Sequence, residues 1–133
     1  MRSIPVGAKG RATLIVAPAH LANQFKDATL PPVLATPMMI LVMENAALNA
    51  IRAYLDPGES AVGTAVDIRH LAATPVGQRV TAEAEVTKVD GRRVLFVVTA
   101  HDEVEEIGRG AHERMVVDLP RLTQRLAAKA KQG

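Results

Sequence analysis

The sequence contains no cysteine, which excludes a disulfide, a thiolate nucleophile and a thiolate metal site. Aromatic residues make up only 2% of the chain, so its core must be aliphatic and few rings are available to stack on nucleic-acid bases. The formal net charge is only +2, and lysines and arginines are interleaved with acidic residues instead of forming a block. No nucleic-acid partner is therefore expected.

Long hydrophobic runs are also missing. The apolar segment 34–43 is too short to span a bilayer, and Glu44 and Asn45 follow it at once. The first 16 residues lack the apolar core of a signal peptide, because proline, glycine and charged residues interrupt them. Together with the absence of cysteine, this predicts a cytoplasmic protein with no membrane partner.

What the chain does contain fits a single domain spanning residues 1–133. A hydrophobic content of 48% over 133 residues favours a packed core over disorder. Apolar periodicity and turn formers predict strands over 10–17, 60–74, 77–90, 92–104 and 107–119, and a short final helix over 120–131. Asp90 and Gly91 form a strong signal for a two-residue hairpin between two of these strands.

The segment 34–55 predicts a long helix that is apolar on nearly all sides. Thr36 can cap its first turn, Pro37 fits its first position, and Asp56 begins the sequence that ends it. The order of elements predicts an α+β fold in which a curved antiparallel sheet wraps around this central helix. Since one sheet covers only part of such a helix, we expect a second copy to cover the rest. This predicts a homodimer, with a dimer of dimers as an open alternative.

Glu44 lies in the middle of this helix but outside its polar stripe, which consists of Asn45, Asn49 and Arg52. Its neighbours one and two turns away are aliphatic, so the carboxylate shares an apolar face. Removal from water raises the pKa of a carboxylate, which suits a base or nucleophile near neutral pH. A structural carboxylate, hydrogen-bonded to a strand or to a second copy, fits equally well. The pattern alone leaves both interpretations open.

The histidines give a weaker signal. Strand alternation places His70 on one face with Thr64, Val66 and Ile68, where a satisfied core histidine is the commoner case. The remaining three are scattered, and no pair has the spacing of a metal site, so no metal is expected: His20, His101 and His112.

Three further residues are ambiguous from the sequence alone. Thr36 has a sufficient role as helix cap, and it lies eight positions before Glu44, roughly 12 Å along a helix axis. The two could share a site only through a bridging substrate or across a dimer. Gly63 can simply ease a strand bend, and Arg114 can be a solvated surface charge.

These segments together resemble the hot-dog-fold thioesterases, and most closely their fluoroacetyl-CoA thioesterase-like branch, over roughly residues 10–118. The resemblance is carried by the stretches LPPVLATPMMILVMENAA, SAVGTAVDIRHLAATPVGQRVTAEAEV, DGRRVLFVVTAHDE and IGRGAHERMVV. It implies a central helix wrapped by an antiparallel sheet, a homodimer, and acyl-CoA sites at the subunit interface.

The resemblance also implies roles for individual residues. In that branch a Thr at the helix start, a Glu on the helix and a His on the following strand form the catalytic group, and Thr36, Glu44 and His70 match them. Glu44 would be the nucleophile or the base for water, His70 would stabilise charge or move protons, and Thr36 would position its neighbours. Gly63 and Arg114 match a glycine and an arginine that contact the substrate.

One departure concerns the loop before the helix. Enzymes of this branch that select fluorinated acyl groups carry aromatic residues there that form a lid, whereas QFKDATLPPV has Phe25 as its only aromatic. The resemblance therefore supports the reaction but not the fluorinated substrate.

The sequence predicts an acyl-CoA thioesterase that hydrolyses a small acyl thioester to a free acid and CoA. Coenzyme A is part of the substrate, and no separate cofactor is expected. The alternatives are a non-catalytic acyl-CoA binding or sensing protein and an enoyl-thioester hydratase or dehydratase. The acyl group, and the choice between CoA and acyl carrier protein, stay open.

Overall fold

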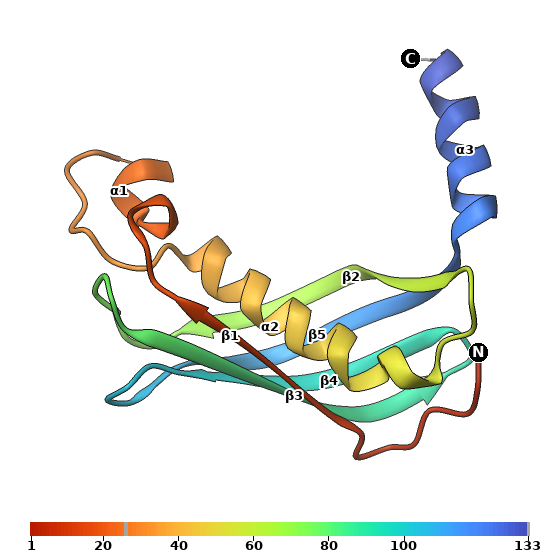
Figure 1. Cartoon of the computed structure of the whole chain (residues 1–133), viewed down its shortest axis with the longest axis horizontal. Coiled ribbons are helices and arrows are strands. Elements are labelled where there is room, and N and C mark those ends of the chain that lie inside the picture. The colour runs from red at the N-terminus through yellow and green to blue at the C-terminus, as the bar shows by residue number, and fades with distance from the viewer. Residues whose placement is uncertain (26, 133) are drawn as a thin grey trace.

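The computed structural model describes residues 1–25 and 27–132. A long helix, α2 (Thr36–Ile51), lies against one face of a curled five-stranded antiparallel sheet (Figure 1). The sheet has the order β1-β3-β4-β5-β2, and its strands are β1 (Lys9–Ile15), β2 (Glu59–His70), β3 (Arg79–Asp90), β4 (Arg93–His101) and β5 (Glu106–Asp118). The predicted arrangement of a helix wrapped by a curved sheet is confirmed.

Helix α2 packs through one continuous apolar face. Its buried residues are Met39, Val42, Met43, Ala46, Ala47, Ala50 and Ile51. The three alanines allow the strands to approach the helix backbone closely. Asn45 and Asn49 are exposed on the opposite side, and Arg52 follows in the 3-10 turn η2 (Arg52–Tyr54). The expected polar stripe is therefore present, and it fixes which side of α2 meets the sheet.

The first turn of α2 differs from the prediction. The residue that precedes the helix is Ala35, with no side-chain cap, and Thr36 and Pro37 occupy the first two helical positions. Thr36 therefore does not cap the helix. Its hydroxyl instead lies 2.8 Å from Nδ1 of His70, so a partner on a distant strand takes the oxygen that would otherwise satisfy the helix terminus.

Strands β3 and β4 form the centre of the core by simple alternation. Their inward residues are Val80, Ala82, Ala84 and Val86 on β3 and Val94, Phe96, Val98 and Ala100 on β4, and all are buried. The predicted hairpin between them is confirmed, but Asp90 pairs with Arg93, so the two loop residues are Gly91 and Arg92. Gly91 has a φ of 61°, as the first position of a tight hairpin turn requires.

Strands β2 and β4 end four and three residues earlier than predicted, because polar groups make turns after them. β4 stops at His101, and Oδ1 of Asp102 accepts hydrogen bonds from the backbone N–H groups of Val104 and Glu105 at 2.8 and 2.9 Å. Thr74, on the segment that follows β2, donates its hydroxyl to Oδ2 of the same aspartate at 2.8 Å. This aspartate therefore ties the two turns together.

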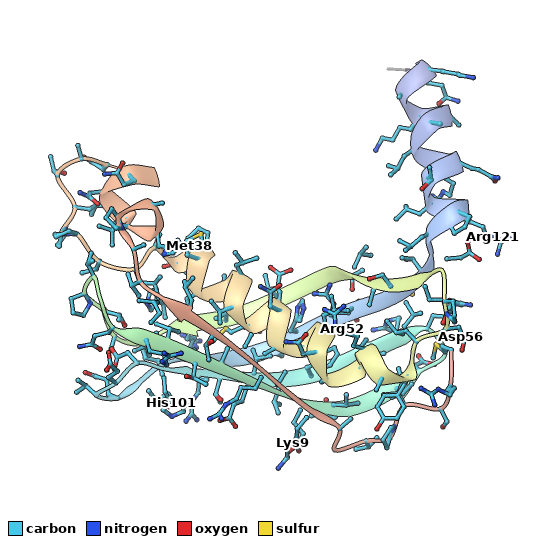
Figure 2. All side chains as sticks on the ribbon, in the orientation of Figure 1. Lys9, Met38, Arg52, Asp56, His101 and Arg121 are labelled. Carbon is cyan, nitrogen blue, oxygen red and sulfur yellow. The ribbon has the colours of Figure 1, made fainter. Side chains whose placement is uncertain are left out.

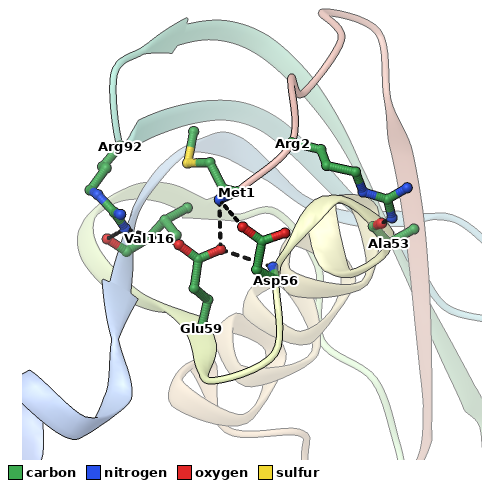
Figure 3. Close-up of polar contacts among 7 residues, drawn as sticks. All are labelled: Met1, Arg2, Ala53, Asp56, Glu59, Arg92 and Val116. Carbon is green, nitrogen blue, oxygen red and sulfur yellow. Dashed lines mark hydrogen bonds and ion pairs between the residues drawn. The ribbon is translucent and has the colours of Figure 1, made fainter.

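The ends of the described chain lie at the same end of the molecule (Figure 1). The Met1 ammonium group forms ion pairs with Asp56 at 2.5 Å and Glu59 at 3.0 Å. Arg92 reaches Glu59 at 3.3 Å (Figure 3). Next to this cluster, helix α3 (Leu119–Gln132) stands away from the sheet. None of its described residues is buried, and Arg121 near its start is exposed (Figure 2).

The opposite end of the molecule carries the short elements η1 (Pro18–His20) and α1 (Ala22–Phe25). They precede the loop that leads into α2. Among the described residues, no helix has the length and apolar character needed to cross a bilayer.

Candidate active site

Strand β2 is an edge strand with a bulge that decides where its side chains point. Its pairing with β5 shifts between Gly63 and Ala65, which leaves Thr64 as the extra residue. Thr64 donates its hydroxyl to the Glu113 carboxylate at 2.6 Å, on the exposed face of the sheet. The predicted grouping of Thr64 with His70 on one face is therefore wrong. Gly63 and His70, which a regular strand would turn to opposite faces, share the face that α2 covers.

The first polar pair of the site joins α2 to the end of β2. The Thr36 hydroxyl lies 2.8 Å from Nδ1 of His70, and Nε2 of this ring is buried without a hydrogen-bond partner among the described residues. Burial lowers the pKa of His70 below its ordinary value of 6.5. The ring is therefore mainly neutral at pH 7 and able to accept a proton.

An apolar cleft of about 440 Å³ opens beside this pair. Apart from Thr36 and His70, its lining residues are aliphatic: Ala22, Leu30, Val33, Leu34, Leu71, Ala72 and Ala73. The loop before α2 thus contributes Leu30 and Val33, and the segment after β2 closes the other side. The side chain of Phe25, the one aromatic of the predicted lid region, lies outside the described part of the structure.

The second polar group surrounds Glu44. Its Oε2 lies 3.8 Å from Nη1 of Arg114, and the Glu44 side chain keeps 36% of its surface exposed. Within one chain, Glu44 is therefore half-buried, not enclosed. Arg114 is only 7% exposed and donates from Nη2 to the Ala61 carbonyl at 2.6 Å. The arginine predicted to be either a surface charge or a substrate contact is thus a buried cation beside the carboxylate.

Gly63 borders the same space. A Cβ atom at this position would lie 2.9 Å from Oε2 of Glu44 and 3.3 Å from Cε1 of His112. A residue larger than glycine would therefore displace the carboxylate. The sequence interpretation of Gly63 as a simple strand bend is incomplete, since the missing side chain also keeps the surface in front of Glu44 open.

His112 is the residue of this group that the sequence analysis missed. It lies two positions before Arg114 on β5. The residue is 3% exposed, and its ring stacks on Phe96 with 5.9 Å between centroids. Burial, together with the charge of Arg114, lowers its pKa. The signal that could have found it is the spacing of two on a predicted strand, which places both side chains on one face.

The five candidate residues therefore gather in two groups. Thr36 and His70 form one, and Glu44, Gly63 and Arg114 form the other. The two groups are separated by the eight residues from Thr36 to Glu44, roughly 12 Å along α2. Among the residues that the structure describes, no three His, Asp or Glu side chains come together in a way that could hold a metal ion.

Comparison with known proteins gives a consistent result. Residues 16–119 match the family model described as fluoroacetyl-CoA-specific thioesterase. The fluoroacetyl-CoA thioesterase of Streptantibioticus cattleyicolor is 45% identical over 106 residues, which are 80% of this chain and 76% of that protein.

Two solved structures extend the match to the fold. A variant of the fluoroacetyl-CoA-specific thioesterase, in complex with fluoroacetate and CoA, aligns with a TM-score of 0.83 and 41% identity, covering 89% of this chain and 98% of that one. A thioesterase superfamily member from Thermus thermophilus aligns over 100% of both chains with a TM-score of 0.89 and 32% identity.

A helix wrapped by a curled antiparallel sheet, with these structural neighbours, defines a hot-dog thioesterase fold. The chain belongs to the fluoroacetyl-CoA-specific thioesterase family. This membership confirms the class of enzyme predicted from the sequence, a thioester hydrolase acting on acyl-CoA, and the resemblance from which that prediction came.

Proposed function

We propose that this protein hydrolyses a small acyl-CoA to a free acid and CoA, without a metal ion, at a site formed between two copies of the chain. The observation that carries the proposal is the hydrogen bond between Thr36 and His70, two residues that line an otherwise aliphatic cleft. It supplies a neutral imidazole and a hydroxyl beside a surface suited to an alkyl group. A purely binding cleft has no need of that pair.

The chemistry divides between the two groups. Glu44 attacks the thioester carbonyl carbon directly, or takes a proton from the water molecule that does so. The carbonyl oxygen then carries negative charge, which the backbone N–H of Gly63 stabilises in this scheme. Collapse of the intermediate breaks the carbon–sulfur bond and releases the CoA thiolate. On the direct route, water then hydrolyses the mixed anhydride left on Glu44 to the free acid and regenerates the carboxylate. On either route the neutral His70 ring accepts the proton that water loses and passes it to the thiolate. Arg114 balances the charge of Glu44 beside the substrate.

Geometry favours a dimer as the way to unite the groups. β2 is an edge strand of 12 residues that pairs with β5 on one side and with no strand of the described chain on the other. Its inward-facing Val66 is 50% exposed in one chain. An exposed apolar edge strand is a template for pairing with another chain. Two β2 strands that pair antiparallel about a two-fold axis near Val66 bring the Gly63 end of one copy against the His70 end of the other.

The substrate is proposed to carry a small aliphatic acyl group. The lining of the cleft by leucine, valine and alanine supports this. The fluorinated substrate of the relatives is one member of the panel that should be tested. A cytoplasmic location is part of the same proposal, and a chain without cysteine is compatible with a reducing compartment.

The first experiment measures thiol release from a panel of short, branched, aromatic, long and fluorinated acyl-CoAs, with wild type beside Glu44→Gln. Turnover of one acyl class by wild type, lost in the variant while the dimer persists, supports the proposal. If no member of the panel releases thiol although acyl-CoA binds by calorimetry, the protein is a binding protein and the proposed hydrolysis is wrong.

A complementation experiment tests the composite site. Glu44→Gln and His70→Gln are each expected to be inactive as homodimers. If each site takes Glu44 from one copy and His70 from the other, a mixed dimer retains one intact site. An equal mixture after subunit exchange then recovers about a quarter of wild-type activity, because half of the dimers are mixed. No recovery despite confirmed exchange would place both groups of one site in the same chain.

A further inference from the structure

His112 lies at the centre of a chain of contacts that no step of the reaction above uses. Its Nδ1 is 2.8 Å from the carbonyl oxygen of Ala65, and its Nε2 is 3.3 Å from Nη1 of Arg114. A carbonyl oxygen can only accept a hydrogen bond, and a guanidinium can only donate one. Both contacts are satisfied by a single form of the ring, the neutral tautomer with its proton on Nδ1.

The two contacts connect parts of the site that are distant in sequence. Ala65 is the first paired residue after the bulge in β2, so the Nδ1 contact fixes the backbone on one side of Gly63. Nη1 of Arg114 also donates to the Glu44 backbone carbonyl at 3.4 Å and lies 3.8 Å from Oε2 of Glu44. His112 thus holds both the bulge and the cation that faces Glu44.

The surroundings leave the ring little freedom to change state or position. His112 stacks on Phe96, with ring planes inclined by 27°, and its Cε1 borders the space in front of Gly63. The charged groups that face it are Arg114, Glu44 and Glu113. A second proton on Nε2 would point at the Arg114 guanidinium and abolish its hydrogen-bond acceptor.

We propose that His112 is a positioning residue: as the neutral Nδ1–H tautomer it accepts a hydrogen bond from Arg114 and thereby keeps Nη1 of this guanidinium 3.8 Å from Oε2 of Glu44. The Ala65 contact selects the tautomer, and the tautomer supplies the acceptor. Removal of the acceptor frees Nη1 of Arg114 to pair more closely with the Glu44 carboxylate, which withdraws that carboxylate from the substrate. This inference rests on the proposed function of Glu44.

Two nearly isosteric variants separate the two contacts. Glutamine places a polar group where Nε2 lies and can still accept from Arg114, whereas asparagine reaches only the Nδ1 position and the Ala65 carbonyl. We expect His112→Gln to keep kcat/KM within about threefold of wild type. We expect His112→Asn to lower it at least about tenfold, mainly through kcat. The exposed histidine variant His101→Gln is the matched control and should behave as wild type.

The proposal is wrong if His112→Asn is as active as His112→Gln, or if kcat falls only in proportion to the fraction of folded protein in each variant. Either result would reduce His112 to a packing residue. Urea unfolding of both variants at pH 7 measures the fraction of folded protein by which kcat is corrected.

A spectroscopic measurement tests the geometry without any substrate. In ¹⁵N-resolved NMR spectra of the imidazole rings, His112 is expected to show a protonated Nδ1 and an unprotonated Nε2 at pH 7. The Nε2 signal should move in Arg114→Met but not in His101→Gln. A ring protonated on Nε2 overturns the inference. Because this experiment needs no turnover, it tests the tautomer of His112 and its contact with Arg114 even if the panel of acyl-CoAs shows that the proposed hydrolysis is wrong.

Discussion

The Thr36 hydroxyl lies 2.8 Å from Nδ1 of His70 across 34 positions of sequence. The contact joins the first turn of α2 to the last residue of β2, and both residues line the aliphatic cleft. Since Ala35 precedes the helix and no side chain caps it, the hydroxyl of Thr36 serves the imidazole and not the helix terminus. Removal of this hydroxyl should therefore affect the reaction without removing a helix cap.

Thr36→Val should therefore lower kcat/KM at least about tenfold, the effect of losing one hydrogen bond of roughly 1.4 kcal/mol in the reaction. The free energy of unfolding should change by less than about 1 kcal/mol, because no helix cap is lost. Thr36→Ser restores the hydroxyl and should recover most of the activity. A Thr36→Val enzyme with wild-type kinetics in steady-state assays would contradict the role given to this contact.

The pH dependence of kcat/KM should report the neutral His70 ring. Burial lowers the pKa of His70 below its ordinary value of 6.5, so the midpoint of the acid limb of kcat/KM should lie below pH 6.5. Below that, protonation of the ring should reduce kcat/KM. Profiles for wild type and His70→Gln, measured between pH 5 and 8, check this. An acid limb with its midpoint above pH 6.5 would show that the pKa is not lowered.

Gly63→Ala should affect activity more than stability. The added methyl group would lie 2.9 Å from Oε2 of Glu44, the flexible end of a half-exposed side chain, which can swing away at little cost in folding free energy. It would also lie 3.3 Å from Cε1 of His112, where a shift of a few tenths of an ångström relieves the contact. We expect kcat to fall at least about tenfold and the free energy of unfolding to change by less than about 1 kcal/mol. A crystal structure of the variant should show the carboxylate displaced. Unchanged kcat would indicate that the space before Gly63 is not used.

The cluster at the end of α2 predicts a loss of stability in acid. The backbone N–H of Asp56, and then the Met1 ammonium group, lower the pKa of Glu59 below its ordinary value of 4.5. A carboxylate with a lower pKa in the folded protein stabilises it fully above its unfolded pKa, and this stabilisation is lost as the pH falls through the folded pKa.

Urea unfolding of wild type and Glu59→Gln should therefore differ at pH 7, and the difference should shrink below about pH 4.5. A difference that is independent of pH would mean that the charge of Glu59 does not contribute.

Much of the fold could be predicted because local signals and packing agree. The alternation of Val80, Ala82, Ala84 and Val86 survives in β3 because one face of this central strand meets α2 and the other meets solvent. The Asp90–Gly91 signal gave the correct hairpin because the backbone there needs a positive φ. The stripe of Asn45 and Asn49 predicted the orientation of α2, because its polar side faces solvent and its apolar side meets the sheet.

The errors at the site have one cause, since each depends on a partner far away in sequence. Thr36 looks like a helix cap until His70 is placed beside it. Thr64 looks like part of a regular strand because nothing in the local pattern marks a bulge whose hydroxyl partner, Glu113, lies 49 positions away. The spacing of two places His112 on one strand face with Arg114, but its contact with the Ala65 carbonyl, 47 positions away, is visible only in the structure. The resemblance to a family supplied the other candidate residues.

The bulge at Thr64 also decides which residues of β2 face the site. Gly63 and His70 are separated by seven positions, an odd number, and they share a face only because one residue between them is not counted in the pairing. If the bulge migrated along β2 toward His70, the residues it passed would exchange faces, so that Asp67 would turn inward and Ile68 outward. Burial of a carboxylate and exposure of an isoleucine oppose this migration. The distance between the two polar groups is thus maintained by strand register, which can change only in whole-residue steps, whereas a loop could vary it continuously.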